Sequence, residues 1–217
     1  MTAIAADPEI LPAVIPVFPL GGAVLLPRAV LPLNIFEPRY LAMVRDAMQG
    51  TRLIGMIQPR GDDGRELFGI GCVGRITDCH ETDDGRMLIA LTGVVRFAVT
   101  RELDVTTPYR QVMPDFEAFA ADSGEPLPLS PSARAALEKE LRAYLDVQGL
   151  SADWDAVADA DDEALVTTLA AACPFDAVEK QALLEARDLP TRAATLTALM
   201  TFAQGADAAG PGGATRQ

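Results

Sequence analysis

The chain has 217 residues, of which 49% are hydrophobic and 23% are charged, a balance typical of a globular protein with a substantial core. Its formal net charge is −13, and an acidic surface repels phosphate backbones, so nucleic acid is excluded as an expected partner. The sequence contains no apolar run long enough to span a membrane and begins without the basic segment of a signal peptide.

Residues 12–36 consist of short apolar runs separated by proline and glycine. Prolines exclude a helix here, because proline lacks the amide N–H and its ring clashes within a helix. Short strands are therefore predicted, with proline at edges or bends. The apolar spacing then becomes helical, with Pro38 suited to the first helical position and Gly50 to the end, which predicts a helix over 38–48.

Strand patterns resume at residue 52 and continue to 119. The Asp-Gly pair within 82–85 indicates a hairpin turn between two of these strands. The predicted strands are 52–59, 67–81, 86–93, 94–103 and 107–119. Several short strands with regular turns and one early helix predict a closed or nearly closed β-barrel over 12–119.

The composition changes after the barrel. Residues 120–132 are rich in proline, serine and glycine, and we expect a linker there. Residues 133–204 show helical periodicity and predict a helical bundle, with Ser130 or Ser132 capping its first helix. The predicted helices are 133–149, 160–173, 174–186 and 189–203. Residues 205–217 have low complexity and are expected to form a disordered tail.

The sequence offers no catalytic or metal-binding constellation, and we expect neither a catalytic residue nor a cofactor. The single histidine, His80, ends a predicted strand beside a turn and has no evident partner. Cys72 and Cys79 lack the paired spacing of a zinc site, and their odd separation places them on opposite faces of a regular strand. The only lysines, Lys139 and Lys180, fall on predicted helix surfaces, and phosphate-loop motifs are absent.

Cysteine usage bears on the compartment. Only three cysteines occur, at 72, 79 and 173, so the sequence implies no disulfide framework. Free thiols suit a reducing environment. We expect a cytoplasmic protein without a membrane partner.

The stretch from Val30 to Tyr40 places the charged pair Glu37 and Arg39 around Pro38 within an otherwise apolar segment. We interpret Glu37, Pro38 and Arg39 as a structural motif where a strand becomes a helix. Glu37 would cap the helix, and Arg39 would reach a carbonyl or carboxylate of the barrel. Direct substrate contact is the alternative interpretation.

Five motifs resemble the N-terminal substrate-binding domain of the ATP-dependent Lon protease family. They are FPL at 18–20, LLP at 25–27, LPLNIFEPRY at 31–40, GCVGRI at 71–76 and GVVRF at 93–97. The segment 179–196 resembles the helical part of that domain, and the resemblance covers roughly 12–203. It implies an α+β fold: a PUA-like β-barrel with one early helix, followed by a C-terminal helical bundle. It also implies a stand-alone domain that lacks the ATPase and peptidase parts and is not an enzyme.

The resemblance favours a polypeptide-binding function, with unfolded or specific polypeptides bound through apolar residues and an unpaired strand edge. The groove between barrel and helices is the expected location, because ligand sites favour such junctions. Phe36, Tyr40 and Met43 are the candidate contacts. The alternative is a structural or adaptor protein that recognises one folded partner, either Lon or a second copy in a homodimer.

Overall fold

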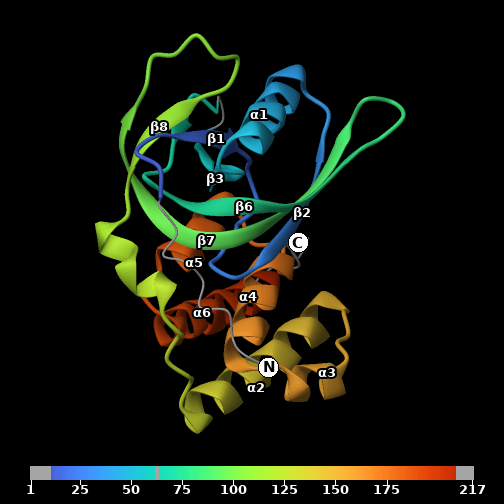
Figure 1. Ribbon diagram of the computed structural model, residues 1–217. Coiled ribbons are helices and arrows are strands. Elements are labelled where there is room, and N and C mark those ends of the chain that lie inside the picture. Colours follow the sequence, from blue (N-terminus) through green and yellow to red (C-terminus); the bar gives the residue numbers. More distant parts are fainter. Residues whose placement is uncertain (1–10, 62–63, 209–217) are drawn as a thin grey trace, which may run out of the picture.

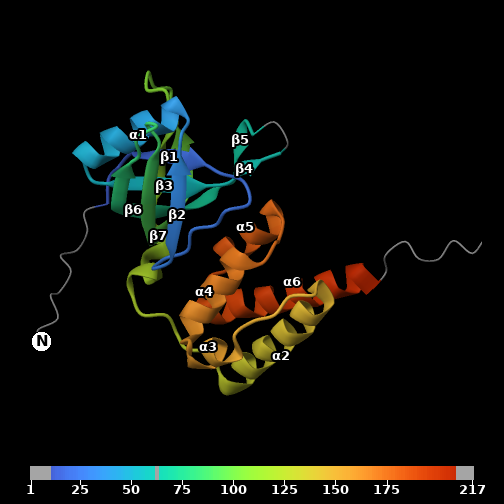
Figure 2. The ribbon, with the colours of Figure 1, turned by 90° about the vertical axis from the view of Figure 1, so that its right-hand side faces the viewer.

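The computed structural model describes residues 11–61 and 64–208, with side chains described to residue 205. A β-barrel lies above the C-terminal helices, and the helix α1 (Pro38–Gln49) covers the barrel on the side away from them (Figure 1, Figure 2). The main strands are β1 (Ile15–Pro19), β2 (Val30–Ile35), β3 (Leu53–Ile57), β6 (Ile70–Glu81), β7 (Met87–Glu102) and β8 (Gln111–Asp115). A small separate hairpin consists of β4 (Pro59–Arg60) and β5 (Glu66–Leu67).

The main sheet closes on itself through β7. Its strand order is β2-β7-β6-β3-β1-β8, and β7 also pairs with β8. The pairing of β1 with β3 is parallel, whereas the other pairings of this sheet are antiparallel. The predicted α+β fold with a nearly closed barrel is therefore confirmed.

The prediction of two strands at 86–93 and 94–103 is wrong. They form a single strand of 16 residues, β7, with a register shift against β6 next to Gly93. The Gly93 N–H donates to the carbonyl of Ala29 at 2.8 Å, and the Gly93 carbonyl accepts from the N–H of Arg28 at 2.8 Å. A Cβ atom at this position would lie 2.0 Å from the carbonyl oxygen of Leu26. Glycine thus lets the loop after β1 cross β7, while a bulge bends the strand without ending it.

The barrel interior is filled around Phe97. Gly71 on β6 and Gly55 on β3 leave room for this ring, since an added Cβ would lie 2.6 Å and 3.0 Å from its Cζ atom. Close packing thus requires glycine at position 71. The buried residues of this inner cluster are Ile15, Val17, Leu53, Ile57, Val73, Val95, Phe97, Val112 and Phe119.

Helix α1 (Pro38–Gln49) matches the helix predicted over 38–48. The remaining helices are η1 (Glu117–Ser123, a 3-10 helix), α2 (Pro131–Gln148), α3 (Trp154–Asp159), α4 (Asp162–Ala172), α5 (Ala177–Glu185) and α6 (Leu189–Ala208). The linker expected at 120–132 thus begins within η1 and ends within the first turn of α2. Residues 205–208 continue α6, and the rest of the expected tail lies outside the described residues.

Side-chain caps decide where the helices start. Ser130 caps α2 by accepting a hydrogen bond from the N–H of Ala133, as predicted. The third predicted helix begins at Ala177 instead of Pro174, because Asp176 and Glu179 form a reciprocal capping box. The sequence prediction missed α3, which is only six residues long.

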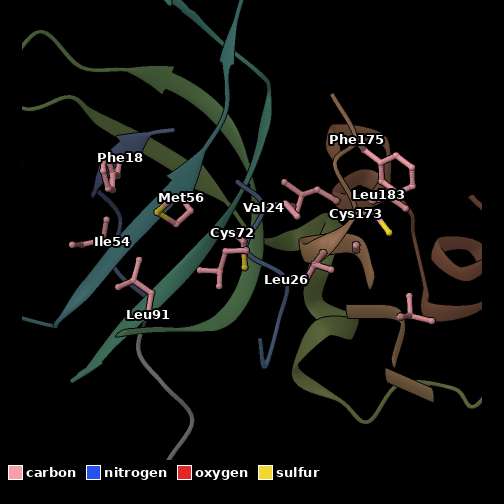
Figure 3. Packing of buried hydrophobic residues seen from close by; sticks show 14 of the residues in the cluster. Phe18, Val24, Leu26, Ile54, Met56, Cys72, Leu91, Cys173, Phe175 and Leu183 are labelled. Carbon is pink, nitrogen blue, oxygen red and sulfur yellow. The ribbon is translucent and has the colours of Figure 1, made fainter. Parts of the chain in front are cut away.

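A second, larger core cluster runs along the outside of the barrel and into the helices. Figure 3 shows Phe18 and Ile54 at one end of this cluster, Phe175 and Leu183 at the other, and Cys72 between them. The barrel and the helices therefore share a continuous apolar core.

We predict that Gly93→Ala destabilises the fold by about 3 kcal/mol, because the new methyl group would overlap a backbone carbonyl that cannot move without displacing the loop. Urea unfolding measures the change. Gly69→Ala is the control, since no atom lies within 4 Å of the position of an added Cβ there. Equal stability of the two variants would show that the loop does not rest on Gly93.

Candidate functional site

The predicted motif at the start of α1 forms a local ion pair. Arg39 and Glu37 are joined by N–O distances of 2.7 Å and 2.9 Å, and the guanidinium lies 4.5 Å from the centre of the Tyr40 ring. Glu37 occupies the N-cap position, but its side chain makes no capping hydrogen bond, so that part of the prediction is wrong. Arg39 holds the carboxylate beside itself, and an exposed pair of this kind contributes about 0–1 kcal/mol.

The three candidate contact residues have different surroundings. Tyr40 is 5% exposed and Met43 is fully buried, both within the larger core cluster. The ring centres of Tyr40 and Phe18 lie 4.2 Å apart. Phe36 is 64% exposed and is the one residue of the three that a ligand can reach in this conformation. Helix α1 is thus mainly a packing element of the barrel.

The strand edge of β2 is interrupted by proline. Within the described residues, β2 pairs with β7 alone, and Pro32 lies opposite Ala90 in the middle of that ladder. Because proline has no N–H, it is tolerated in a strand where that group would face away from the partner. The free edge of β2 therefore lacks a donor at its centre, which disfavours binding of a polypeptide by strand addition.

The barrel and the helices meet at a buried polar junction. Arg96 on β7 and Asp122 in η1 are both buried, and they form two hydrogen bonds between Nε and Oδ2 at 2.9 Å and between Nη2 and Oδ1 at 2.7 Å. Asp122 also accepts the backbone N–H of Arg96 at 3.0 Å. The guanidinium lies 4.7 Å from the centre of the Phe119 ring. This paired geometry compensates both charges for their loss of water.

The same guanidinium holds the C-terminal end of α5. Its Nη1 atom donates to the carbonyls of Leu184 and Ala186 at 2.9 Å and 2.5 Å. Arg192 donates to the carbonyl of Leu183 at 2.9 Å. Burial, reinforced by the positive charge of Arg96, lowers the pKa of Arg192 to about 10. Two cations thus satisfy carbonyls at the negative end of a helix dipole.

A second set of contacts joins the residue directly after β3 and the loop after β1 to α5. The side chain of Gln58 donates to the carbonyl of Ala177 at 2.9 Å and to the side chain of Gln181 at 3.2 Å. Lys180 donates to the carbonyl of Gly22 at 2.8 Å. The buried polar residues of the described chain are Gln58, Arg96, Asp122, Lys180, Gln181 and Arg192, and all of them lie at this junction. Polar contacts therefore fix how the helices sit on the barrel.

A groove of about 630 Å³ lies between the loop before β2 and helix α4, here called the barrel–helix groove. Arg28, at φ 65°, reaches across it and donates from Nε to both carboxylate oxygens of Glu163 at 2.9 Å. Its Nη1 atom also donates to the carbonyl of Asp122 at 2.6 Å. Hydrogen bonding to Glu163 raises the pKa of Arg28. Val30, 63% exposed, lies at the rim.

On the other side of α4 lies a cavity of about 440 Å³ between α2, α3 and α4, here called the apolar pocket. Ala164, Thr168 and Ala172 of α4 line both this pocket and the barrel–helix groove. Leu150, 55% exposed, stands at the edge of the pocket. The larger apolar side chains that line it are Leu141, Tyr144, Leu145, Val157, Leu165 and Leu169.

Helix α3 forms the outer wall of the apolar pocket, and Arg134 makes several hydrogen bonds to it and to the residues that follow it. This α2 side chain donates to the carbonyl of Val157 at 2.6 Å and to the carbonyl of Ala160 at 3.1 Å. It also pairs with Glu138 and Asp162. Helix α3 contains no fully buried residue, and its Trp154 and Val157 side chains pack, partly buried, against the larger core cluster.

No group of three or more potential metal ligands occurs within the part of the chain that the structure describes. Cys72 and Cys79 were predicted on opposite faces of a strand, but both pack against the larger core cluster. A register shift in β6 between Ile76 and Asp78 inserts an extra residue and restores the same face. Burial raises the pKa of Cys72 to about 12, so this thiol is unreactive.

Residues 14–201 match the family model described as the ATP-dependent protease La (LON) substrate-binding domain. The chain belongs to this family. It is 29% identical over 105 residues to a Lon protease of Desulfosudis oleivorans, a match that covers 46% of this chain and 13% of that protease. It is 30% identical over 149 residues to a Lon protease of Roseiflexus castenholzii, covering 67% of this chain and 18% of that protease.

Solved structures give the same assignment. The Lon N-terminal domain protein from Xanthomonas campestris is 26% identical, with a TM-score of 0.62, and the match covers 85% of this chain and 97% of that one. The N-terminal domain of Mycobacterium avium complex Lon protease is 18% identical, with a TM-score of 0.62 over 87% and 98% of the two chains, and shows the shared fold. These matches concern the substrate-binding part of Lon alone.

The sequence prediction placed the site of this Lon-type domain at the barrel–helix junction but did not find the apolar pocket. The only available signal was the run of alanine and leucine over 160–173, which equally suits a buried helix. Arg96 was also missed, because arginine in a strand is ordinarily exposed.

We predict that Asp122→Asn lowers the free energy of unfolding by about 3–5 kcal/mol, because Arg96 would remain buried without its counter-charge. Urea denaturation gives the value. Glu37→Gln is the matched control at an exposed ion pair and is expected to change stability by less than about 1 kcal/mol. If Asp122→Asn lowers the free energy of unfolding no more than Glu37→Gln does, the buried ion pair does not stabilise the junction.

Proposed function

We propose that this Lon-type domain binds unfolded or specific polypeptide segments through the apolar pocket and the adjoining barrel–helix groove. The observation that carries the proposal is an open cavity of about 440 Å³ with apolar walls in a chain of the substrate-binding family. Ligand pockets are typically concave and mainly apolar. Extended chains expose apolar side chains that folded proteins bury, and such side chains fit this pocket.

The shape of α4 supports binding of an extended segment. Small side chains at 164, 168 and 172 separate the two concavities, so a polypeptide backbone can cross the helix closely. Val30 and Leu150 then offer exposed apolar contacts on either side. A segment lying across α4 would contact both concavities.

We assign the chain a holding function without ATP hydrolysis or peptide cleavage, and without a cofactor. The curated Lon proteases to which it is similar share only 11–18% of their length with it. No helix among the described residues is both long and apolar enough to cross a membrane. Free cysteines at 72, 79 and 173 support a reducing, cytoplasmic setting.

A second candidate function is recognition of one folded partner, including a second copy of this chain. Exposed apolar residues on the barrel favour it: Leu88 on β7, Val30 on β2 and Phe36 just beyond β2. Exposed apolar side chains of this kind can contact a folded partner. The edge of β2, which Pro32 interrupts, is poorly suited to pairing with an extended polypeptide. In this second candidate function Phe36 is a contact residue for the folded partner. Tyr40 and Met43 lie in the core and contribute only by packing.

We predict that Leu150→Ser weakens binding of a permanently unfolded polypeptide by roughly five- to tenfold, because about 1 kcal/mol or more of apolar contact is lost. Fluorescence anisotropy of the labelled polypeptide measures the affinity. The only tryptophan of the chain, Trp154, begins α3 beside the pocket and provides a second, label-free signal.

Val178→Ser is the control for this experiment. Val178 is 66% exposed on α5 and lines neither the apolar pocket nor the barrel–helix groove. The affinity of the Val178→Ser variant for the unfolded polypeptide should equal that of the unmodified protein. If Leu150→Ser binds as tightly as this control, the pocket is not the binding site.

If Phe36→Ser alone abolishes capture of a folded partner, the second candidate function is favoured.

A further inference from the structure

The rim of the apolar pocket is strongly acidic. The segment 143–179, which forms most of its wall, contains no lysine, arginine or histidine. Asp153 and Asp161 are exposed at the N-terminal ends of α3 and α4, where each side chain accepts backbone N–H groups. Asp155 and Asp159 are exposed along α3. Of these four carboxylates, Asp153 lines the apolar pocket and Asp161 lines the barrel–helix groove, whereas Asp155 and Asp159 line neither concavity and lie on the adjoining surface of α3.

Few cations oppose these carboxylates. Arg134 faces the same region, but its charge is shared between Glu138 and Asp162. Arg142 lies over the Trp154 ring, 3.7 Å from the ring centre. Two cations against four exposed carboxylates leave this side of the pocket with a net negative charge.

Resting on the proposed function, we propose that the apolar pocket selects polypeptide segments in which an apolar anchor is flanked by lysine or arginine. The anchor would enter the cavity, and the flanking cations would lie within a Debye length of the carboxylates at Asp153, Asp155, Asp159 and Asp161. Flanking acidic residues would be repelled by the same groups. Such charge complementarity discriminates between anchors that are equally apolar.

The acidic rim also argues against a second copy of this chain in the pocket. Two such rims would face each other with like charge, and the net charge of −13 adds to that repulsion. A basic, apolar segment is the occupant that the charges favour.

Three peptides with one shared leucine-rich core and flanks of lysine, serine or glutamate test the proposal, each titrated with the full chain by anisotropy. At low salt, we expect the lysine-flanked peptide to bind about tenfold more tightly than the serine-flanked one, and the glutamate-flanked one more weakly still. At about 1 M salt the three affinities should converge, because screening removes the charge contribution but not the apolar one.

The double variant Asp155→Asn with Asp159→Asn should reduce the preference for lysine, because two of the four carboxylates lose their charge, while leaving the affinity for the serine-flanked peptide unchanged. Asp104→Asn with Glu66→Gln changes the net charge equally on the barrel, at two exposed residues that line neither concavity, and should keep the preference. Both pairs replace surface carboxylates with amides and carry little risk to folding.

The outcomes separate the two proposals. Equal binding of the three peptides, still weakened by Leu150→Ser, would overturn the charge selection and leave the proposed function intact. Loss of the preference in both double variants would assign it to overall charge and would also overturn the selection by the rim. Absence of binding by all three peptides would overturn the proposed function and the selection with it, and dimers that Leu150→Ser dissolves would then assign the pocket to a second copy.

Discussion

The arrangement of the molecule depends on one buried guanidinium. Arg96 is the point where a barrel strand, the 3-10 helix after the barrel and the end of α5 meet, with partners in all three. A charge removed from water is tolerated only when each of its donors has an acceptor, and here the acceptors come from both halves of the fold. The orientation of the helices on the barrel is therefore specified by directional contacts, whereas the shared apolar core alone would allow them to slide.

That orientation creates both concavities around α4. The bridge from Arg28 to Glu163 spans the barrel–helix groove, and Arg134 positions α3 to complete the apolar pocket. Three arginines thus set the position of α4 and its neighbours, and each reaches a backbone carbonyl as well as a carboxylate. Side-chain packing and the hydrogen bonds of these arginines define the candidate site, so its shape is preorganised for a ligand.

The sequence alone predicted those elements whose signals are local. Proline and glycine punctuation located α1, and helical periodicity with Ser130 as a cap located α2. The sequence prediction failed where contacts between residues far apart in the sequence determine the structure. The continuity of β7 depends on a loop that crosses Gly93, and the burial of Arg96 depends on partners 26 and 88 residues away. Phe36 and Tyr40 belong to one motif, yet tertiary packing exposes the first and buries the second.

Pro32 has a consequence for solubility as well as for recognition. An exposed strand edge with a full set of donors is a template on which other chains can extend a sheet and begin to aggregate. Under the proposed function this hazard is large, because the unfolded polypeptides that the domain would bind can themselves form strands. With its central donor missing, β2 offers such chains no continuous edge on which to extend a sheet.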